Sequence, residues 1–153
     1  MSVSAIRATL YSAVNGVTNV GKVYDYERWA NEWDDFLTLF KTTISTVVQV
    51  RGWEITYRGF ANQPPMDFSG KHIRAHRFHV VGYMGLDDSL STEKTFANLT
   101  EDVADAIDAN ATLQGSTYYY VADVGIDEHE PRMFGGVLCH YALINVVVEE
   151  KIT

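Results

Sequence analysis

The fold of this chain is decided near its C-terminus by a long apolar run, VLCHYALINVVVEE, at residues 137–150. A strand with one face in water alternates apolar and polar residues, whereas this run places apolar side chains on both faces. Such a pattern is typical of a strand in the interior of a sheet. We therefore expect Val137–Glu150 to be a strand near the centre of the sheet.

Other segments supply candidate partner strands. From Val50 to Phe60 apolar residues alternate with polar ones, the pattern of a half-buried strand. Ile73–Met84 reads as a second long strand, Thr117–Val124 is a tyrosine-rich third, and Val20–Tyr24 is a short extended piece. The irregular composition of Gly59–Lys71, with Pro64-Pro65, and of Gly125–Gly136, with Pro131, predicts two long loops.

Three segments have helical spacing. The first places Ile6, Leu10, Ala13 and Val14 at helical spacing and stops at Asn15-Gly16. The third opens at Ser91, a candidate cap, and its buried stripe comprises Phe96, Leu99, Val103 and Ile107.

The second helix is predicted from an aromatic stripe. Asp25 is a candidate cap, and the stripe comprises Trp29, Trp33, Phe36, Leu37 and Phe40. Such a stripe could line a ligand pocket, but we interpret it as core that packs against the sheet.

These elements predict a single α+β domain that spans residues 1–153. We expect a mainly antiparallel, mixed sheet of about four to five strands, with three helices packed on one face.

Composition limits the classes of function. The net charge is −8, from 20 acidic and 12 basic residues. Proteins that bind nucleic acid usually present a basic face to the phosphates, so sequence-specific DNA binding is not expected. We interpret the short basic group Lys71, Arg74 and Arg77 as a solvated strand face.

Several features argue against secretion and membrane insertion. No segment approaches about 18 consecutive apolar residues, and no signal peptide is recognisable. The only cysteine, Cys139, excludes an intramolecular disulfide and is interpreted as a buried thiol. A reducing, cytoplasmic setting fits best.

A search for catalytic and metal sites gives no candidate. In a strand His72 and His76 share one face and His79 takes the other, so the three do not converge on a metal. The run at residues 127–130 is interpreted as a solvated acidic loop, and neighbours such as Cys139 and His140 point to opposite faces of a strand. Phosphate-binding, dinucleotide-binding and serine-hydrolase motifs are missing. We therefore expect no cofactor, no metal and no enzymatic activity.

The order and spacing of several patterns do point to a family. They are Asn15-Gly16-Val17, Phe36-Leu37-x-Leu39-Phe40, Trp53-x-Ile55-x-Tyr57, Phe78-x-Val80-x-Gly82-Tyr83, Asp88-Ser89-x-Ser91 followed by Phe96-x-x-Leu99-x-x-x-Val103-x-x-Ala106-Ile107, and Cys139-His140-Tyr141-x-Leu143 to Val148-Glu149. Across nearly its full length the chain resembles the tail terminator (tail completion) proteins of long-tailed bacteriophages, the lambda-type minor tail protein family. The Pro64-Pro65 loop does not map onto that pattern.

The resemblance implies a virion structural protein of the tail and neck, assembled in the host cytoplasm. It would form a hexameric ring that caps the tail tube, stops its polymerisation and joins the tail to the head connector. Its partners would be copies of itself, the tail-tube protein and the head–tail connector protein. DNA would pass through the ring only as cargo.

Ring closure requires two different patches on each subunit. The two predicted loops supply candidates for contact with a neighbouring subunit or the tube, although burial within the monomer is equally open for each. These are Phe60, Pro65, Met66, Phe68, Met133 and Phe134.

Acidic residues of the third helix are candidates for a channel wall that repels DNA phosphates: Glu101, Asp102, Asp105 and Asp108. The alternative is that they keep an outer helix soluble.

Two other functions stay open. One is another neck, connector or tail-tube subunit. The other is a small-molecule-binding module or enzyme, with Trp29–Phe40 and Tyr118–Tyr120 as pocket walls.

Overall fold

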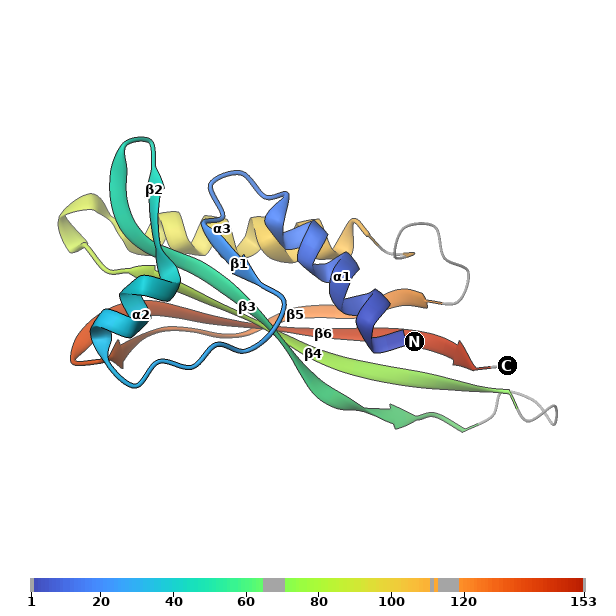
Figure 1. Ribbon diagram of the computed structural model, residues 1–153. Helices are drawn as coiled ribbons and strands as arrows, with labels where there is room; N and C mark the ends of the chain where they lie inside the picture. The colour runs from blue at the N-terminus through green and yellow to red at the C-terminus, as the bar shows by residue number, and fades with distance from the viewer. Residues whose placement is uncertain (1, 65–70, 111, 113–118, 153) are drawn as a thin grey trace.

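The computed structural model describes residues 2–64, 71–110, 112 and 119–152 and has the α+β architecture that the sequence predicts (Figure 1). Its elements, in chain order, are α1 (Ser2–Asn15), β1 (Lys22–Tyr24), α2 (Trp33–Phe40), β2 (Lys41–Ile44), β3 (Val47–Asn62), β4 (His72–Gly85), a 3-10 turn (Asp88–Leu90), α3 (Thr92–Asp108), β5 (Tyr119–Phe134) and β6 (Val137–Ile152).

The described strands form one six-stranded sheet in the order β1-β3-β4-β6-β5, with β2 also paired to β3. Among the described strands only β1 pairs in parallel, so the sheet is mixed and mainly antiparallel. As expected from its apolar faces, β6 lies inside the sheet, between β4 and β5.

The strand count exceeds the expected four to five because β2 was not predicted. β2 joins β3 through Ser45 and Thr46, which both have positive φ angles of 48° and 70°. Tight hairpins of this kind usually carry Asn or Gly at such positions, so the local sequence gave no signal for the turn.

α1 and α3 cover one face of the sheet, and the core lies between them and the strands (Figure 1). At its centre the fully buried Trp53 of β3 stacks on Phe96 of α3, with ring centroids 6.1 Å apart. The apolar stripes predicted for these two helices are confirmed. Their buried members are Ile6, Leu10 and Val14 on α1, and Phe96, Leu99, Val103 and Ile107 on α3.

The expectation of one shared face holds for α1 and α3, whereas α2 packs on the opposite face. Phe36 and Phe40 of α2 contact Tyr83, with centroids 5.4 and 4.9 Å away. Tyr83 directly follows Gly82, and Gly82 lies against the ring of Trp53 on the side of β4 that faces α3. Successive side chains of a strand point to opposite faces, so α2 closes a second, smaller apolar cluster.

The predicted helix around Trp29 is shorter than expected. α2 begins only at Trp33, no cap is provided by Asp25, and Trp29 is 81% exposed, so its assignment to the core was wrong. The residues before α2 have an irregular conformation, which long-range contacts of Arg28 stabilise. The backbone N–H of Arg28 donates to Glu54, and the Arg28 guanidinium lies over the ring of Tyr24.

The second predicted long loop, Gly125–Gly136, is strand up to Phe134, whereas of the first, Gly59–Lys71, only residues 59–62 belong to a strand and residues 65–70 lie outside the described part of the chain. β3 continues to Asn62 past an irregularity near Gly59, whose φ is +98°. Residues 125–134 pair with β6, and the turn is confined to Gly135 and Gly136, which both have positive φ. Pro131 is tolerated because β5 is an edge strand.

No helix in the described part of the chain is long and apolar enough to cross a membrane.

The packing of Trp53 on Gly82 generates a stability prediction. A Cβ at Gly82 would lie 2.5 Å from Cζ3 of Trp53. Because overpacking in a close-packed core forces side chains and backbone to shift, Gly82→Ala should lower the free energy of unfolding by about 1–3 kcal/mol. Urea denaturation measures this loss. Gly85→Ala, on the same strand with its nearest contact at 3.8 Å, is the control and should change stability by less than about 0.5 kcal/mol. Equal effects of the two variants would contradict this packing.

Candidate functional site

The turns of two hairpins expose apolar side chains, and we call this group the hairpin end. It comprises Val47 and Val48 on the β2–β3 hairpin (each 56% exposed) and Met133, Val137 and Leu138 on the β5–β6 hairpin (63%, 39% and 41%). Single exposed apolar residues are common, whereas groups of them on a folded protein more often mark a surface that another molecule covers.

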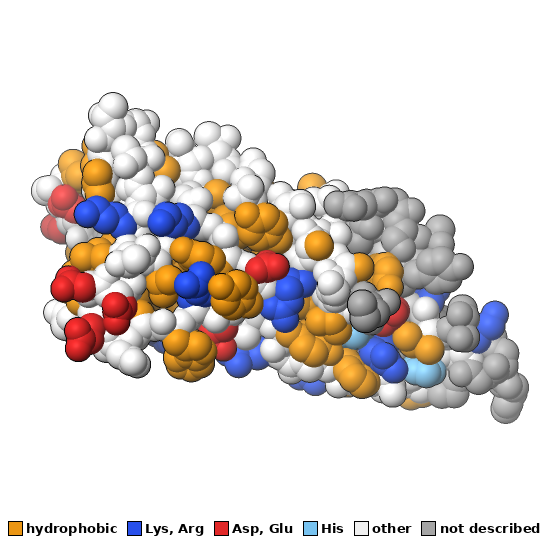
Figure 2. Space-filling view, in the orientation of Figure 1, with side chains coloured by type: hydrophobic (Ala, Val, Ile, Leu, Met, Phe, Trp, Pro, Cys, Tyr) orange, Lys and Arg blue, Asp and Glu red, His pale blue; other side chains and the backbone are white. Residues whose placement is uncertain are grey.

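The strand register places both turns beyond the same end of β4. Arg51 pairs with Met84, and Cys139 pairs with Gly85. Val47 and Leu138 therefore extend past the last residues of β4, in the half of the molecule that lies away from both termini (Figure 1). Figure 2 shows the surface in the same orientation. There the half of the molecule away from the termini carries hydrophobic side chains interspersed with charges of both signs.

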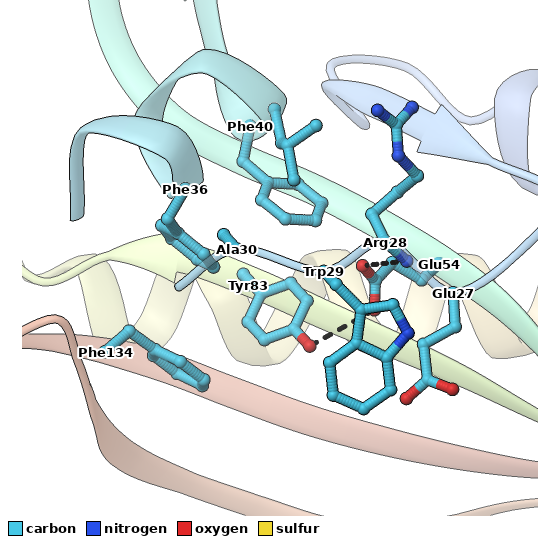
Figure 3. A pocket seen from close by; sticks show the side chains of 10 residues that line it. Glu27, Arg28, Trp29, Ala30, Phe36, Phe40, Glu54, Tyr83 and Phe134 are labelled. Atoms are coloured by element: carbon cyan, nitrogen blue, oxygen red, sulfur yellow. Dashed lines mark hydrogen bonds between the residues drawn. The ribbon is translucent and has the colours of Figure 1, made fainter. Parts of the chain in front are cut away.

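The second feature is a cleft between α2, residues 27–30 and the sheet (Figure 3). Its volume is about 190 Å³. Aromatic side chains of α2, β4 and β5 form much of its lining, and two carboxylates contribute. The lining residues are Glu27, Arg28, Trp29, Ala30, Phe36, Leu39, Phe40, Glu54, Tyr83 and Phe134.

Glu54 is the unusual group in this cleft, since only 3% of its surface is exposed. One carboxylate oxygen accepts the backbone N–H of Arg28 at 3.0 Å, and the other accepts the Tyr83 hydroxyl at 3.2 Å. Burial raises the pKa of Glu54 to about 7, although both hydrogen bonds act in the opposite direction. Because both oxygens already have partners, Glu54 ties residues 27–30 to the sheet.

Two histidines that the sequence offers for metal binding or acid–base catalysis, His76 and His140, are buried and hydrogen-bonded within the fold. His76 is 1% exposed, and its ring nitrogens lie 2.8 Å from Glu150 and 3.2 Å from the Tyr57 hydroxyl. His140 contacts the Thr92 hydroxyl at 2.8 Å, and burial lowers the pKa of His140. Both histidines therefore serve as internal hydrogen-bonding groups.

Thr92 also bonds the backbone of Asp87 and so organises the start of α3. Ser91 occupies the N-cap position of α3, as predicted, but its φ is +53° and its side chain makes no capping hydrogen bond.

Cys139 is buried and free, as expected, and burial raises its pKa to about 11. It belongs to the cluster on the α2 side, whereas His140 faces α3. This confirms that the two side chains point to opposite faces and form no thiol–imidazole pair.

The acidic run at residues 127–130 is part of β5 rather than a loop. Glu128 and Glu130 both bond the Arg132 guanidinium, at 2.7 and 2.8 Å. Within the described ranges, no group of three or more His, Cys, Asp or Glu side chains could hold a metal ion.

The sequence-predicted contact residues fall into three groups. Phe60 and Met133 are exposed, at 49% and 63%. Phe134 instead stacks on Phe36, with ring centroids 5.3 Å apart, and supports the α2 cluster. Pro65, Met66 and Phe68 lie outside the described residues.

The acidic candidates on α3 are all exposed: Glu101, Asp102, Asp105 and Asp108. Of the predicted pocket walls, Trp29 lines the cleft and Tyr118 lies outside the described residues.

No protein-family model matches this chain, and no curated protein matches it significantly. The resemblance to the tail terminator family therefore stays a prediction.

Burial of Glu54 generates a pH prediction. Its pKa in the folded protein is above its unfolded value, so between about pH 4.5 and 7 the folded state binds more protons than the unfolded state. This contribution therefore favours folding at low pH and is lost as the pH rises through 7. From pH 8 to pH 5, the wild type should gain about 2 kcal/mol of stability that Glu54→Gln does not gain.

Urea denaturation of both proteins across this pH range measures their free energies of unfolding. The other carboxylates titrate in both proteins, so their contribution cancels in the difference between wild type and Glu54→Gln. Parallel stability profiles for the two proteins would contradict a raised pKa at Glu54.

Proposed function

We propose that this chain is a virion structural protein of a long-tailed phage, a tail terminator that assembles into a closed ring of about six subunits. It caps the tail tube, stops its polymerisation and joins the tail to the head connector. Its place is the tail and neck of the virion, after assembly in the host cytoplasm. It acts through the surfaces that it presents to other proteins, without catalysis.

The hairpin end is the observation that carries this proposal. Its two halves lie toward opposite edges of the sheet. Val47 and Val48 lie on the β2–β3 side, and Met133 and Leu138 on the β5–β6 side. A ring needs two different patches that meet head to tail. Apolar hairpin tips at the two sides of one sheet supply such a pair.

The edges of the sheet support the same association. β5 is a 16-residue edge strand that pairs only with β6 among the described strands. Edge strands present unpaired backbone groups, which natural proteins cover or block. Pro131 and the charged pair of Glu128 with Arg132 interrupt this edge, which favours a defined contact at its end over continuous sheet extension.

The charge distribution is compatible with a DNA conduit. Glu101, Asp102, Asp105 and Asp108 project from the exposed surface of α3. A channel wall with this charge would repel phosphates and let the duplex slide. The orientation of α3 in a ring decides whether these residues line the channel or its outside.

The Glu54 cleft does not favour a small-molecule function. Its volume of about 190 Å³ is below the range of roughly 300–1,000 Å³ that is typical of ligand pockets. Both oxygens of Glu54 already have protein partners.

The test is native mass spectrometry of the purified protein, together with electron microscopy. The wild type should give rings of about six subunits. Val48→Lys and Leu138→Lys each place a charge in the apolar contact, so each should weaken association at least about tenfold while thermal unfolding of the monomer stays unchanged. Ala8→Lys, at an exposed position on α1 away from both hairpins, is the control and should keep the rings.

Two outcomes would decide against this function. A wild type that stays monomeric at high concentration, also in the presence of tail tubes, would contradict ring formation. Open-ended stacked tubes would instead indicate a tail-tube subunit.

A further inference from the structure

A buried arginine lies on the α3 side of the sheet, away from the Glu54 cleft. Arg51 of β3 is 6% exposed. Its guanidinium donates to the backbone oxygen of Asn19 at 3.0 Å and to the side-chain oxygen of Gln49 at 2.9 Å. Nε has no hydrogen-bond partner among the described residues, and no carboxylate in that part of the chain lies within 4.0 Å of the guanidinium. Buried charges in proteins are usually paired, so this one is exceptional.

The loop between α1 and β1 holds the arginine in place. Gly21 lies directly on it, and a Cβ there would come 2.3 Å from the Arg51 backbone oxygen and 2.9 Å from Cγ. The φ of Gly21 is +90°, which side-chain-bearing residues rarely adopt. Backbone hydrogen bonds from Val17 to Val14 and from Val20 to Val17 fix the rest of the loop. The position of the guanidinium is therefore set by the fold.

Arg51 lines a pocket of about 240 Å³ between this loop and α3. The other polar lining groups are mostly neutral and can donate hydrogen bonds, namely Thr18, Asn19, Thr95 and Asn98. One carboxylate, Asp102, stands in the lining without reaching the guanidinium. A liquid water molecule occupies about 30 Å³, so the pocket has room for a small ion with part of its hydration shell.

We propose that this pocket binds a small oxyanion, a phosphate or a carboxylate, with Arg51 as the charged contact. A guanidinium presents several N–H donors in one plane, a geometry that matches the oxygens of both groups. The neighbouring hydroxyls and amides would complete the shell of donors. Asp102 opposes the bound charge and limits the affinity. The site belongs to the single subunit and does not require the ring.

The first test is thermal unfolding of the wild type in sodium phosphate, sodium acetate and sodium chloride at matched ionic strength. A ligand that binds only the folded state raises the unfolding temperature with its concentration. Phosphate or acetate should therefore raise that temperature more than chloride does. Arg51→Met keeps much of the apolar stem and should lose the difference, whereas Arg77→Met, at an exposed position on β4, should keep it.

A second variant does not depend on the folding of the arginine mutant. Asp102 is exposed on α3, so Asp102→Asn should fold normally. Removing one like charge near the bound anion should tighten binding about threefold. Asp108→Asn, further along the same helix and outside the pocket lining, is the control and should leave the affinity unchanged.

The two anions also distinguish the natural source. A response to phosphate alone would indicate a phosphate or phosphate ester, and a response to acetate alone would indicate a carboxylate of a protein partner. The proposal would be overturned if neither the wild type nor Asp102→Asn unfolds at a higher temperature in phosphate or acetate than in chloride.

Discussion

The structure depends on the close approach of one large aromatic ring to each face of the central strands. Trp53 lies over Gly82 on one face, and Phe40 lies over Gly52 on the other. A Cβ at either glycine would come within 2.6 Å of a ring atom, so only bare backbone allows both contacts. The layer of α1 and α3 docks around Trp53, and α2 docks through Phe40. This double covering leaves the middle of the sheet inaccessible to partners.

The covering also explains where the molecule can act. Helices and the segment at residues 27–30 cover the centre of the sheet, while the β2–β3 and β5–β6 hairpins extend beyond it. Their turns leave Val48, Met133 and Leu138 in water. Full burial of such a side chain contributes about 1.5–3 kcal/mol. These three side chains are already partly covered in the monomer, so burying the rest of their surface contributes less than that. The hairpin tips therefore need further contacts around them for stable association. The edge strand β5 is the nearest source of such contacts.

The sequence predicted those elements whose periodicity extends over a whole segment. The alternation around Trp53 and the stripe from Phe96 to Ile107 identified β3 and α3, because burial in both cases follows from local pattern. Elements that depend on distant contacts were missed. Glu54 occupies a position that local alternation assigns to solvent, but it is buried in the fold, where distant groups, the Arg28 backbone N–H and the Tyr83 hydroxyl, bond its carboxylate. Likewise, Pro131 indicated a loop, since its place in an edge strand depends on the strand order. Of the hairpin end, Met133 was anticipated and Val48 was not, because β2 had no turn signal.

In the proposed ring, the hairpin end is a contact surface between copies of the chain. Hydrogen–deuterium exchange, measured at concentrations below and above the onset of assembly, shows whether the two hairpins become buried between subunits. Amides at residues 45–48 and 133–138 should become protected on assembly, while the amides near the start of α1 should exchange at an unchanged rate. Assembly without added protection at either hairpin, or protection confined to the other end of the molecule, would contradict it.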